Sequence, residues 1–70
     1  MNVHDKVRLH RQDEAGNWTE HEAQVTHVHC LAGIPTVAVI WDNPDGTREV
    51  RVGVATSNTG EHSHWVEPLK

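Results

Sequence analysis

One stretch of the chain decides the fold, and it reads TVAVIWDNPDGTREVRVGV at residues 36–54. Its two ends alternate between apolar and polar side chains with a period of two, which predicts a β-strand on each side. Between them, Pro44 suits the second position of a type I turn and Gly46 suits the left-handed position that closes a hairpin. The sequence therefore predicts a tight hairpin with strands at residues 36–42 and 47–54.

The alternation also assigns the side chains of this hairpin to faces, because successive residues of a strand point to opposite sides of the sheet. Ala38 and Ile40 are expected on the outer face of the first strand. The side chains expected to face the core are Val37, Val39, Trp41, Val50, Val52 and Val54.

Three more segments are expected to form strands. They are residues 5–12, residues 18–30 and residues 64–69, the last as a closing strand or a short 3₁₀ turn. The second breaks its period near Thr26 and His27, which predicts a β-bulge there. Residues 31–35 and 55–63 are expected to be loops. The inward side chains of the first two segments are expected to be Val7, Leu9, Ala23, Val25, Val28 and Cys30.

These segments predict an all-β domain of five strands that spans residues 1–70. Ten of the apolar residues are valine, and β-branched side chains fit a pleated sheet better than a helix. A short helix from Thr19 is the alternative, since Thr19 and Glu22 have the spacing of a capping box.

The strand series resembles the SH3-like barrels of the KOW, Tudor and small bacterial type. The resemblance rests on Asp5-Lys6-Val7, on Ala23-x-Val25, on Val39-Ile40-Trp41-Asp42 with its hairpin, and on Trp65-Val66-Glu67-Pro68-Leu69 at the end. It implies a five-stranded barrel that binds a peptide, a nucleic acid or another protein. Type II dihydrofolate reductase looks similar in length and strand order. Its Val-Gln-Ile-Tyr stretch corresponds here to Val50-Arg51-Val52-Gly53, so that activity is not expected.

Composition narrows the classes of protein further. A chain of 70 residues with a single cysteine, Cys30, has no internal disulfide, which fits a reducing compartment. No apolar run reaches 18 residues, and no leader opens the chain, so a cytoplasmic protein without a membrane partner is expected. The net charge is −4 with histidine neutral, and protonating all seven histidines would change it to +3.

The most direct functional reading is an interaction module that binds a protein partner or a second copy of itself. Ala38 and Ile40 place apolar atoms on an outer face, and Trp18, which follows a turn, is the expected aromatic anchor of the interface. No phosphate-binding loop, nucleophile elbow or metalloprotease motif is present in the sequence, so catalysis is not expected.

Two alternatives stay open. A KOW-like or Tudor-like barrel would bind nucleic acid through basic residues on two strands, although the acidic net charge disfavours it. A metal-binding protein would use two His-x-His pairs to hold zinc or another transition metal; without it, no cofactor is expected. The nucleic-acid candidates are Lys6, Arg8, Arg48 and Arg51, and the metal candidates are His27, His29, His62 and His64.

Overall fold

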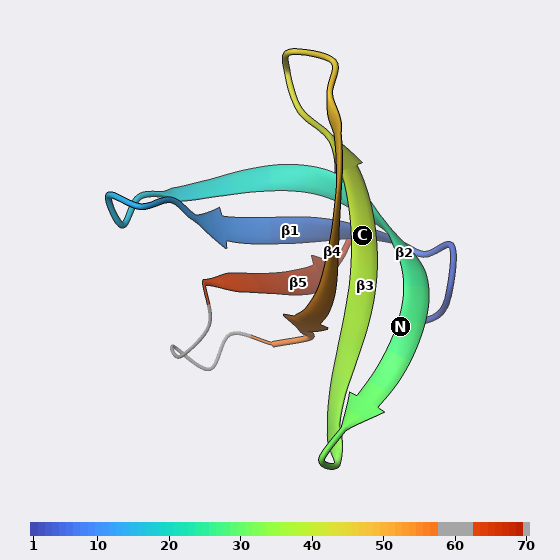
Figure 1. Cartoon of the computed structure of the whole chain (residues 1–70). Helices are drawn as coiled ribbons and strands as arrows, with labels where there is room; N and C mark the ends of the chain where they lie inside the picture. Colours follow the sequence, from blue (N-terminus) through green and yellow to red (C-terminus); the bar gives the residue numbers. More distant parts are fainter. Residues whose placement is uncertain (58–62, 70) are drawn as a thin grey trace.

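The protein is described by a computed structural model that covers residues 1–57 and 63–69. Over these residues the chain forms strands joined by turns and bends, and it contains no helix (Figure 1). The expected all-β chain is confirmed, and Thr19, the start of the alternative helix, lies inside a strand. The strands are β1 (Lys6–Gln12), β2 (Trp18–Leu31), β3 (Ile34–Asp42), β4 (Arg48–Ala55) and β5 (His64–Pro68).

The five strands close into a ring in the order β1-β2-β3-β4-β5. Each strand from β1 to β4 pairs antiparallel with the next, and β5 returns to pair antiparallel with β1. In the described chain, β4 and β5 meet in parallel at one residue pair, Ala55 with Trp65. In Figure 1, the long β2 curves from beside β1 to beside β3, which lets one sheet wrap around a core.

The core lies inside this ring and consists mainly of valine. Full burial of a valine or leucine side chain stabilises a fold by roughly 1.5–3 kcal/mol, so these side chains make a main stabilising contribution to the ring. Alternation predicted every member except Val66. The buried cluster consists of Val7, Leu9, Ala23, Val25, Val37, Val39, Trp41, Val54 and Val66.

The expected β-bulge in the second strand is confirmed. The pairing of β2 with β3 shifts between Val25 and His27, which leaves Thr26 without a partner residue on β3. The Thr26 hydroxyl donates a hydrogen bond to the carbonyl oxygen of Ala38 at 3.3 Å. Bulges increase the local twist and bend of a strand, and this one lies where β2 turns from β1 toward β3.

Beyond this bulge, the β2–β3 hairpin projects past the core. Val28 and Cys30 are exposed, so their expected burial is wrong. Among the described residues, no further strand pairs with β2 beyond the bulge except β3, so the outer end of the hairpin projects away from the core. The expected loop is also shorter: β2 and β3 are joined by Ala32 and Gly33 alone, with φ of 51° and 81°. Two positive φ values are the signature of a type I′ hairpin turn.

The burial expected for two valines of β4 is wrong as well. Val50 and Val52 are 63% and 71% exposed, whereas Val54, the third residue of the same alternating series, is buried. A regular strand would place all three on one face. The strand must therefore change its faces between Val52 and Val54.

A second β-bulge, in β4, makes this change. Val37 pairs with Val54 but Val39 pairs with Arg51, so two residues of β4 stand opposite one residue of β3. One of the two is Gly53, which has a φ of 69°. Glycine adopts this left-handed conformation without the steric cost that a Cβ atom imposes. The extra residue exchanges the faces of β4, which sends Val54 into the core and the earlier valines outward.

Candidate interaction surfaces

Exposed and half-buried apolar side chains gather on the outer face of β3 and β4. Ile40 pairs directly with Val50, and Val52 follows two residues further along β4. Paired residues on one face of a sheet have Cβ atoms about 4.5–5.5 Å apart, so these side chains form one surface. We call Ile40, Val50 and Val52 the β3–β4 patch. Single exposed apolar residues are ordinary, but a contiguous group on one face is typical of a contact surface.

Ala38, which was expected to be exposed beside Ile40, is 2% exposed, so that expectation is wrong. Ala38 is not part of the core cluster. It pairs with His27 on β2 and stands opposite the β4 bulge at Val52 and Gly53. The side chain of Ala38 is a single methyl group between larger neighbours, so little of its surface is exposed. Ala38 therefore lies beneath the side chains of the patch.

One ion pair borders the β3–β4 patch. Asp42 and Arg48 are paired across β3 and β4, two residues beyond Ile40 and Val50, and therefore lie on the same face. The Arg48 Nε donates a hydrogen bond to Asp42 Oδ1 at 2.8 Å. This hydrogen bond lowers the pKa of the Asp42 carboxyl group and raises the pKa of Arg48. The patch thus ends in one negative and one positive charge side by side.

Trp18 is exposed, as expected, but it stands at the far end of β2 from the patch. Trp18 is the first residue of β2 and pairs with Gln12 of β1. Gln24, six residues later on β2, is the residue that pairs with Ile40 of β3. Six residues of strand span about 20 Å. The three expected interface residues therefore do not form one surface. Trp18 is exposed but distant from the patch, Ala38 is buried, and Ile40 is half-buried within the patch.

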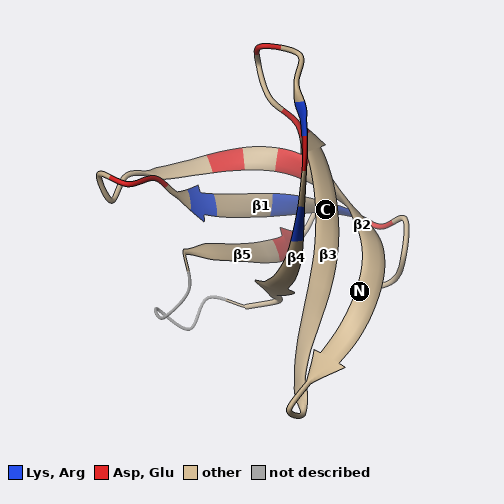
Figure 2. Ribbon diagram, viewed as in Figure 1, with Lys and Arg blue, Asp and Glu red and all other residues tan. Residues whose placement is uncertain are grey.

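The basic residues proposed for nucleic-acid binding lie next to carboxylates. Figure 2 shows acidic and basic segments side by side on β1, β2 and β5. Lys6 Nζ lies 3.6 Å from Glu22 Oε1, and Arg8 Nη1 lies 3.2 Å from Glu67 Oε1. Arg48 is paired with Asp42, as described above. Three of the four candidates, all but Arg51, thus have their charge matched within the sheet, which weakens any attraction for phosphate.

A cluster around His10 was not anticipated from the sequence. The His10 ring lies between two carboxylates, with Nε2 3.1 Å from Glu67 Oε1 and Nδ1 3.5 Å from Glu20 Oε1. Trp65 stacks on the same ring. The three partners come from β2 and β5, the two neighbours of β1, so knowledge of the strand order would have been needed to find the cluster.

The metal candidates are divided between distant strands. The His27 and His29 rings, two residues apart on β2, have centroids 5.9 Å apart and planes 12° from parallel. His64 lies on β5, where its Nδ1 is 2.9 Å from the Ser63 hydroxyl oxygen. His62 lies outside the described residues. In the part of the chain that the structure covers, no three His, Cys, Asp or Glu side chains are placed to hold one metal ion.

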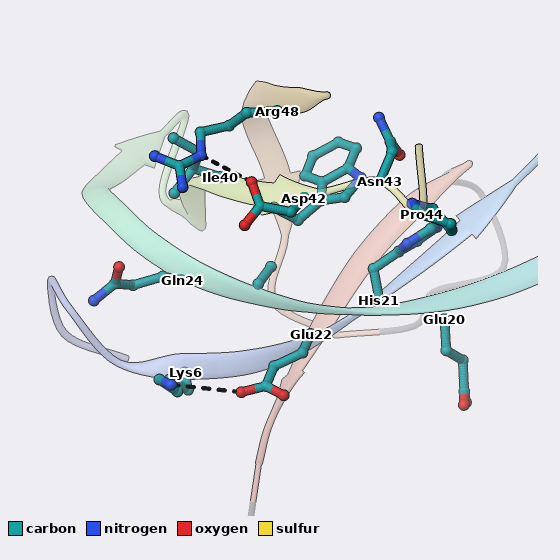
Figure 3. Close-up of a pocket in the computed structure, with 12 residues that line it drawn as sticks. Lys6, Glu20, His21, Glu22, Gln24, Ile40, Asp42, Asn43, Pro44 and Arg48 are labelled. Carbon is teal, nitrogen blue, oxygen red and sulfur yellow. Dashed lines mark hydrogen bonds and ion pairs between the residues drawn. The ribbon is translucent and has the colours of Figure 1, made fainter. Parts of the chain in front are cut away.

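A hollow of about 590 Å³ lies between the patch and the outer face of β1 and β2 (Figure 3). Ile40 lines it on one side and His21 on the other, and Lys6–Glu22 and Arg48–Asp42 are the ion pairs drawn in it. Because these charged groups already have partners, the hollow is a polar flank of the patch.

Comparison of the whole chain with protein-family models, with curated proteins and with solved structures finds no match. The class that the structure itself defines is a small all-β domain with five strands in a closed sheet and an apolar patch on its outer face. No helix within the described ranges is long and apolar enough to cross a membrane.

Proposed function

We propose that this protein is a small SH3-like interaction module that self-associates through the β3–β4 patch and has no catalytic activity of its own. The observation that carries the proposal is the exposure of Val50 and Val52 beside Ile40 on one face of a closed sheet. The free, exposed thiol of Cys30 supports a reducing compartment such as the cytoplasm.

A second copy of the chain is the partner that fits the patch best. A two-fold dimer brings the same surface of both subunits together, so the surface must be complementary to itself. The patch is apolar, and its border carries one carboxylate and one guanidinium, Asp42 and Arg48, so two copies can meet without a net like-charge repulsion. A 70-residue domain with a small core also gains stability from association.

Val50→Asp tests the proposal. This substitution places a charge at the centre of the patch on a residue whose side chain does not contribute to the core, so the fold should remain intact. Val3→Asp is the matched control, because Val3 is also an exposed valine but lies in the N-terminal segment. Sedimentation velocity gives the association state, and circular dichroism gives the fold.

We expect the wild type and Val3→Asp to be dimeric or larger and Val50→Asp to be monomeric with an unchanged spectrum. A wild type that is monomeric at high concentration contradicts the proposal, and so does a Val50→Asp variant that still associates. Trp18→Ala separates the two expected parts of the interface: if Trp18 is an anchor, its loss weakens association, whereas an unchanged mass assigns the contact to the patch alone.

Metal binding is a second candidate, and the near-parallel rings of His27 and His29 favour it. Two imidazoles on one face of a strand can both ligate one ion, and further ligands must come from elsewhere. A zinc titration measured by isothermal titration calorimetry tests this proposal. His29→Asn is expected to abolish zinc binding. A titration without heat at micromolar protein concentration contradicts it.

A further inference from the structure

The outer half of β2 has a free edge. Residues 18–24 pair with β1, and the backbone of Val25 is still hydrogen-bonded to His4 and Asp5. Beyond the bulge, residues 27–31 pair with β3 alone among the described residues. In Figure 1, the lower half of β2 has β3 on one side and no strand on the other. Unpaired N–H and C=O groups along an edge are a template for a further strand.

The hairpin turn determines which backbone groups of this edge are free. A two-residue turn closes on a hydrogen-bonded pair, which here is Leu31 with Ile34. Hydrogen-bonded and non-hydrogen-bonded pairs alternate along an antiparallel ladder. The backbones of His29 and His27 are therefore bonded to β3, because the register is unbroken from His27 to the turn. The backbone N–H and C=O of Val28, between them, point to the free edge.

No charged side chain keeps a second strand away from this edge. Between Glu22 and Asp42 the sequence contains no Asp, Glu, Lys or Arg, and Figure 2 shows this end of β2 and β3 in tan throughout. Native edge strands are commonly protected by charged residues or by proline, and residues 27–31 contain neither. Such an edge is complementary to itself, since a strand can pair antiparallel with its own copy about a two-fold axis.

Two histidines beside this edge form half of a metal site. His27 and His29 are exposed, and they project from the same face of β2 because they are two residues apart in an unbroken register. Their ring centroids are 5.9 Å apart. A zinc ion is usually held by four ligands in a structural site, so two more donors are needed.

The bulge residue Thr26 holds the His27 ring in the form that binds a metal. The Thr26 hydroxyl has a single hydrogen, which it donates to the carbonyl oxygen of Ala38. In the 3.2 Å contact with His27 Nδ1, the hydroxyl oxygen is therefore the acceptor and Nδ1–H is the donor. The other ring nitrogen, Nε2, then carries the free electron pair. Metal-binding histidines commonly have their second nitrogen held by such a hydrogen bond.

We propose that the free edge of β2 pairs antiparallel with the same edge of a second copy, and that His27 and His29 of both copies bind one transition-metal ion. With the two-fold axis at Val28, this residue and its copy exchange both backbone hydrogen bonds. His27 of each copy then stands opposite His29 of the other, with Cβ atoms about 4.5–5.5 Å apart. Four imidazoles on one face suit zinc, copper or nickel.

The strand pairing and the metal ion depend on each other. Backbone hydrogen bonds replace hydrogen bonds with water, so their net contribution is small, and one short edge buries less area than a stable dimer needs. We therefore expect the edge dimer to form only with metal, and a single copy to bind metal weakly. This inference rests on the metal-binding candidate and is independent of the β3–β4 patch.

The edge is tested in Val50→Asp, in which association through the patch is removed. Zinc is the probe: sedimentation velocity measures the mass with and without it, and isothermal titration calorimetry measures the stoichiometry. We expect a monomer without zinc, a dimer with zinc and one ion per two chains. A monomer in saturating zinc, or one ion per chain, overturns the proposal. If this variant associates without metal, the patch proposal fails, whereas the zinc stoichiometry still decides on the edge.

His29→Asn in the same background should abolish both zinc binding and the zinc-dependent dimer. His64→Asn is the matched control, because His64 belongs to the other His-x-His pair, on β5. Cys30→Ser should bind zinc as before, since adjacent residues of a strand face opposite sides and Cys30 points away from the His29 face. Equal losses in His29→Asn and His64→Asn, or loss of zinc binding in Cys30→Ser, would overturn the proposed ligand set.

Val28→Pro separates the strand pairing from the ligands. Proline removes the N–H at the free edge, a position where it is tolerated, and leaves both histidines in place. Val28→Thr is its control, because threonine keeps the N–H and the β-branch. Only Val28→Pro should lose the zinc-dependent dimer. Hydrogen exchange of the Val28 amide in the parent protein measures the same contact without a substitution. Zinc should slow this exchange, and an unchanged exchange rate refutes the pairing.

Discussion

The indole of Trp65 stacks on the imidazole of His10, with ring centroids 4.0 Å apart and planes 8° from parallel. These residues are direct partners in the pairing of β1 with β5. The stack covers one side of the His10 ring and leaves its side chain 14% exposed between Glu20 and Glu67. The last strand is thus attached to the first by a stacked and hydrogen-bonded cluster on the outer face as well as by the core.

This cluster makes the free energy of unfolding depend on pH. The hydrogen bond with His10 is the largest cause that lowers the pKa of Glu67, and the charges of His10 and Arg8 contribute. A carboxyl group with a lower pKa in the folded state stabilises the fold at pH values above its unfolded pKa, and that contribution is lost as the pH falls through the folded value. We therefore expect the free energy of unfolding to decrease from about pH 5 downward.

Glu67→Gln should remove part of this decrease. Urea unfolding at a series of pH values from neutral to acidic measures it, and the variant should show a shallower fall than the wild type. Glu14→Gln is the control, because Glu14 is exposed and no ion pair of the described residues involves it. If Glu67→Gln and the wild type show the same dependence on pH, the hydrogen bond with His10 does not stabilise the fold.

The β4 bulge gives a second prediction. Gly53→Ala should reduce the free energy of unfolding by about 1–2 kcal/mol, because a Cβ atom is disfavoured at a φ of 69°. There is open space around the position, so conformational strain is the whole effect. Gly53→Asn should cost less, since asparagine tolerates the left-handed region better than alanine. Denaturant unfolding checks both, and equal stability of Gly53→Ala and wild type would show that the bulge can be lost.

The same bulge shows what the sequence could and could not reveal about the fold. Alternation identified the strands and most of the core because these depend on local period-two patterning. The faces of Val50 and Val52 were assigned wrongly because a single extra residue inverts every side chain before it. Gly53 was the available signal, since a glycine inside a strand often marks a bulge.

The candidate sites were harder to predict, because they depend on which strands become neighbours. Lys6 and Arg8 resemble a basic surface in the sequence, and their partners Glu22 and Glu67 are 16 and 59 residues away along the chain. Ile40 was identified because its outward direction is local. The patch around it could be recognised only from the register of β3 with β4, and the cluster around His10 only from the pairing of β5 with β1 that closes the ring.

Trp41 provides a third prediction. Trp41→Phe should change the free energy of unfolding by less than about 1 kcal/mol, because the indole Nε1 makes no hydrogen bond among the described residues and its removal relieves an unpaired buried donor. Trp41→Ala should cost about 3–5 kcal/mol, as expected for loss of a large buried ring. Urea unfolding of both variants provides the comparison. A Phe variant as unstable as the Ala variant would show that Nε1 has a partner in solution.

Self-association through the β3–β4 patch predicts a melting temperature that depends on concentration. Association stabilises the folded chain by mass action, and a tenfold rise in protein concentration adds up to about 1.4 kcal/mol per mole of dimer. For a domain of this size, that corresponds to an increase of a few degrees in the melting temperature.

Differential scanning calorimetry over a hundredfold range of concentration measures this increase. The wild type and Val3→Asp should melt at higher temperature as they become more concentrated, whereas Val50→Asp should melt at one temperature throughout. Because Val50 is exposed in the single chain, the three proteins should converge at the lowest concentrations, where all are monomeric. A Val50→Asp variant that is less stable than Val3→Asp even at that limit would mean that Val50 stabilises the single chain, and its effect on association could then not be assigned to the patch.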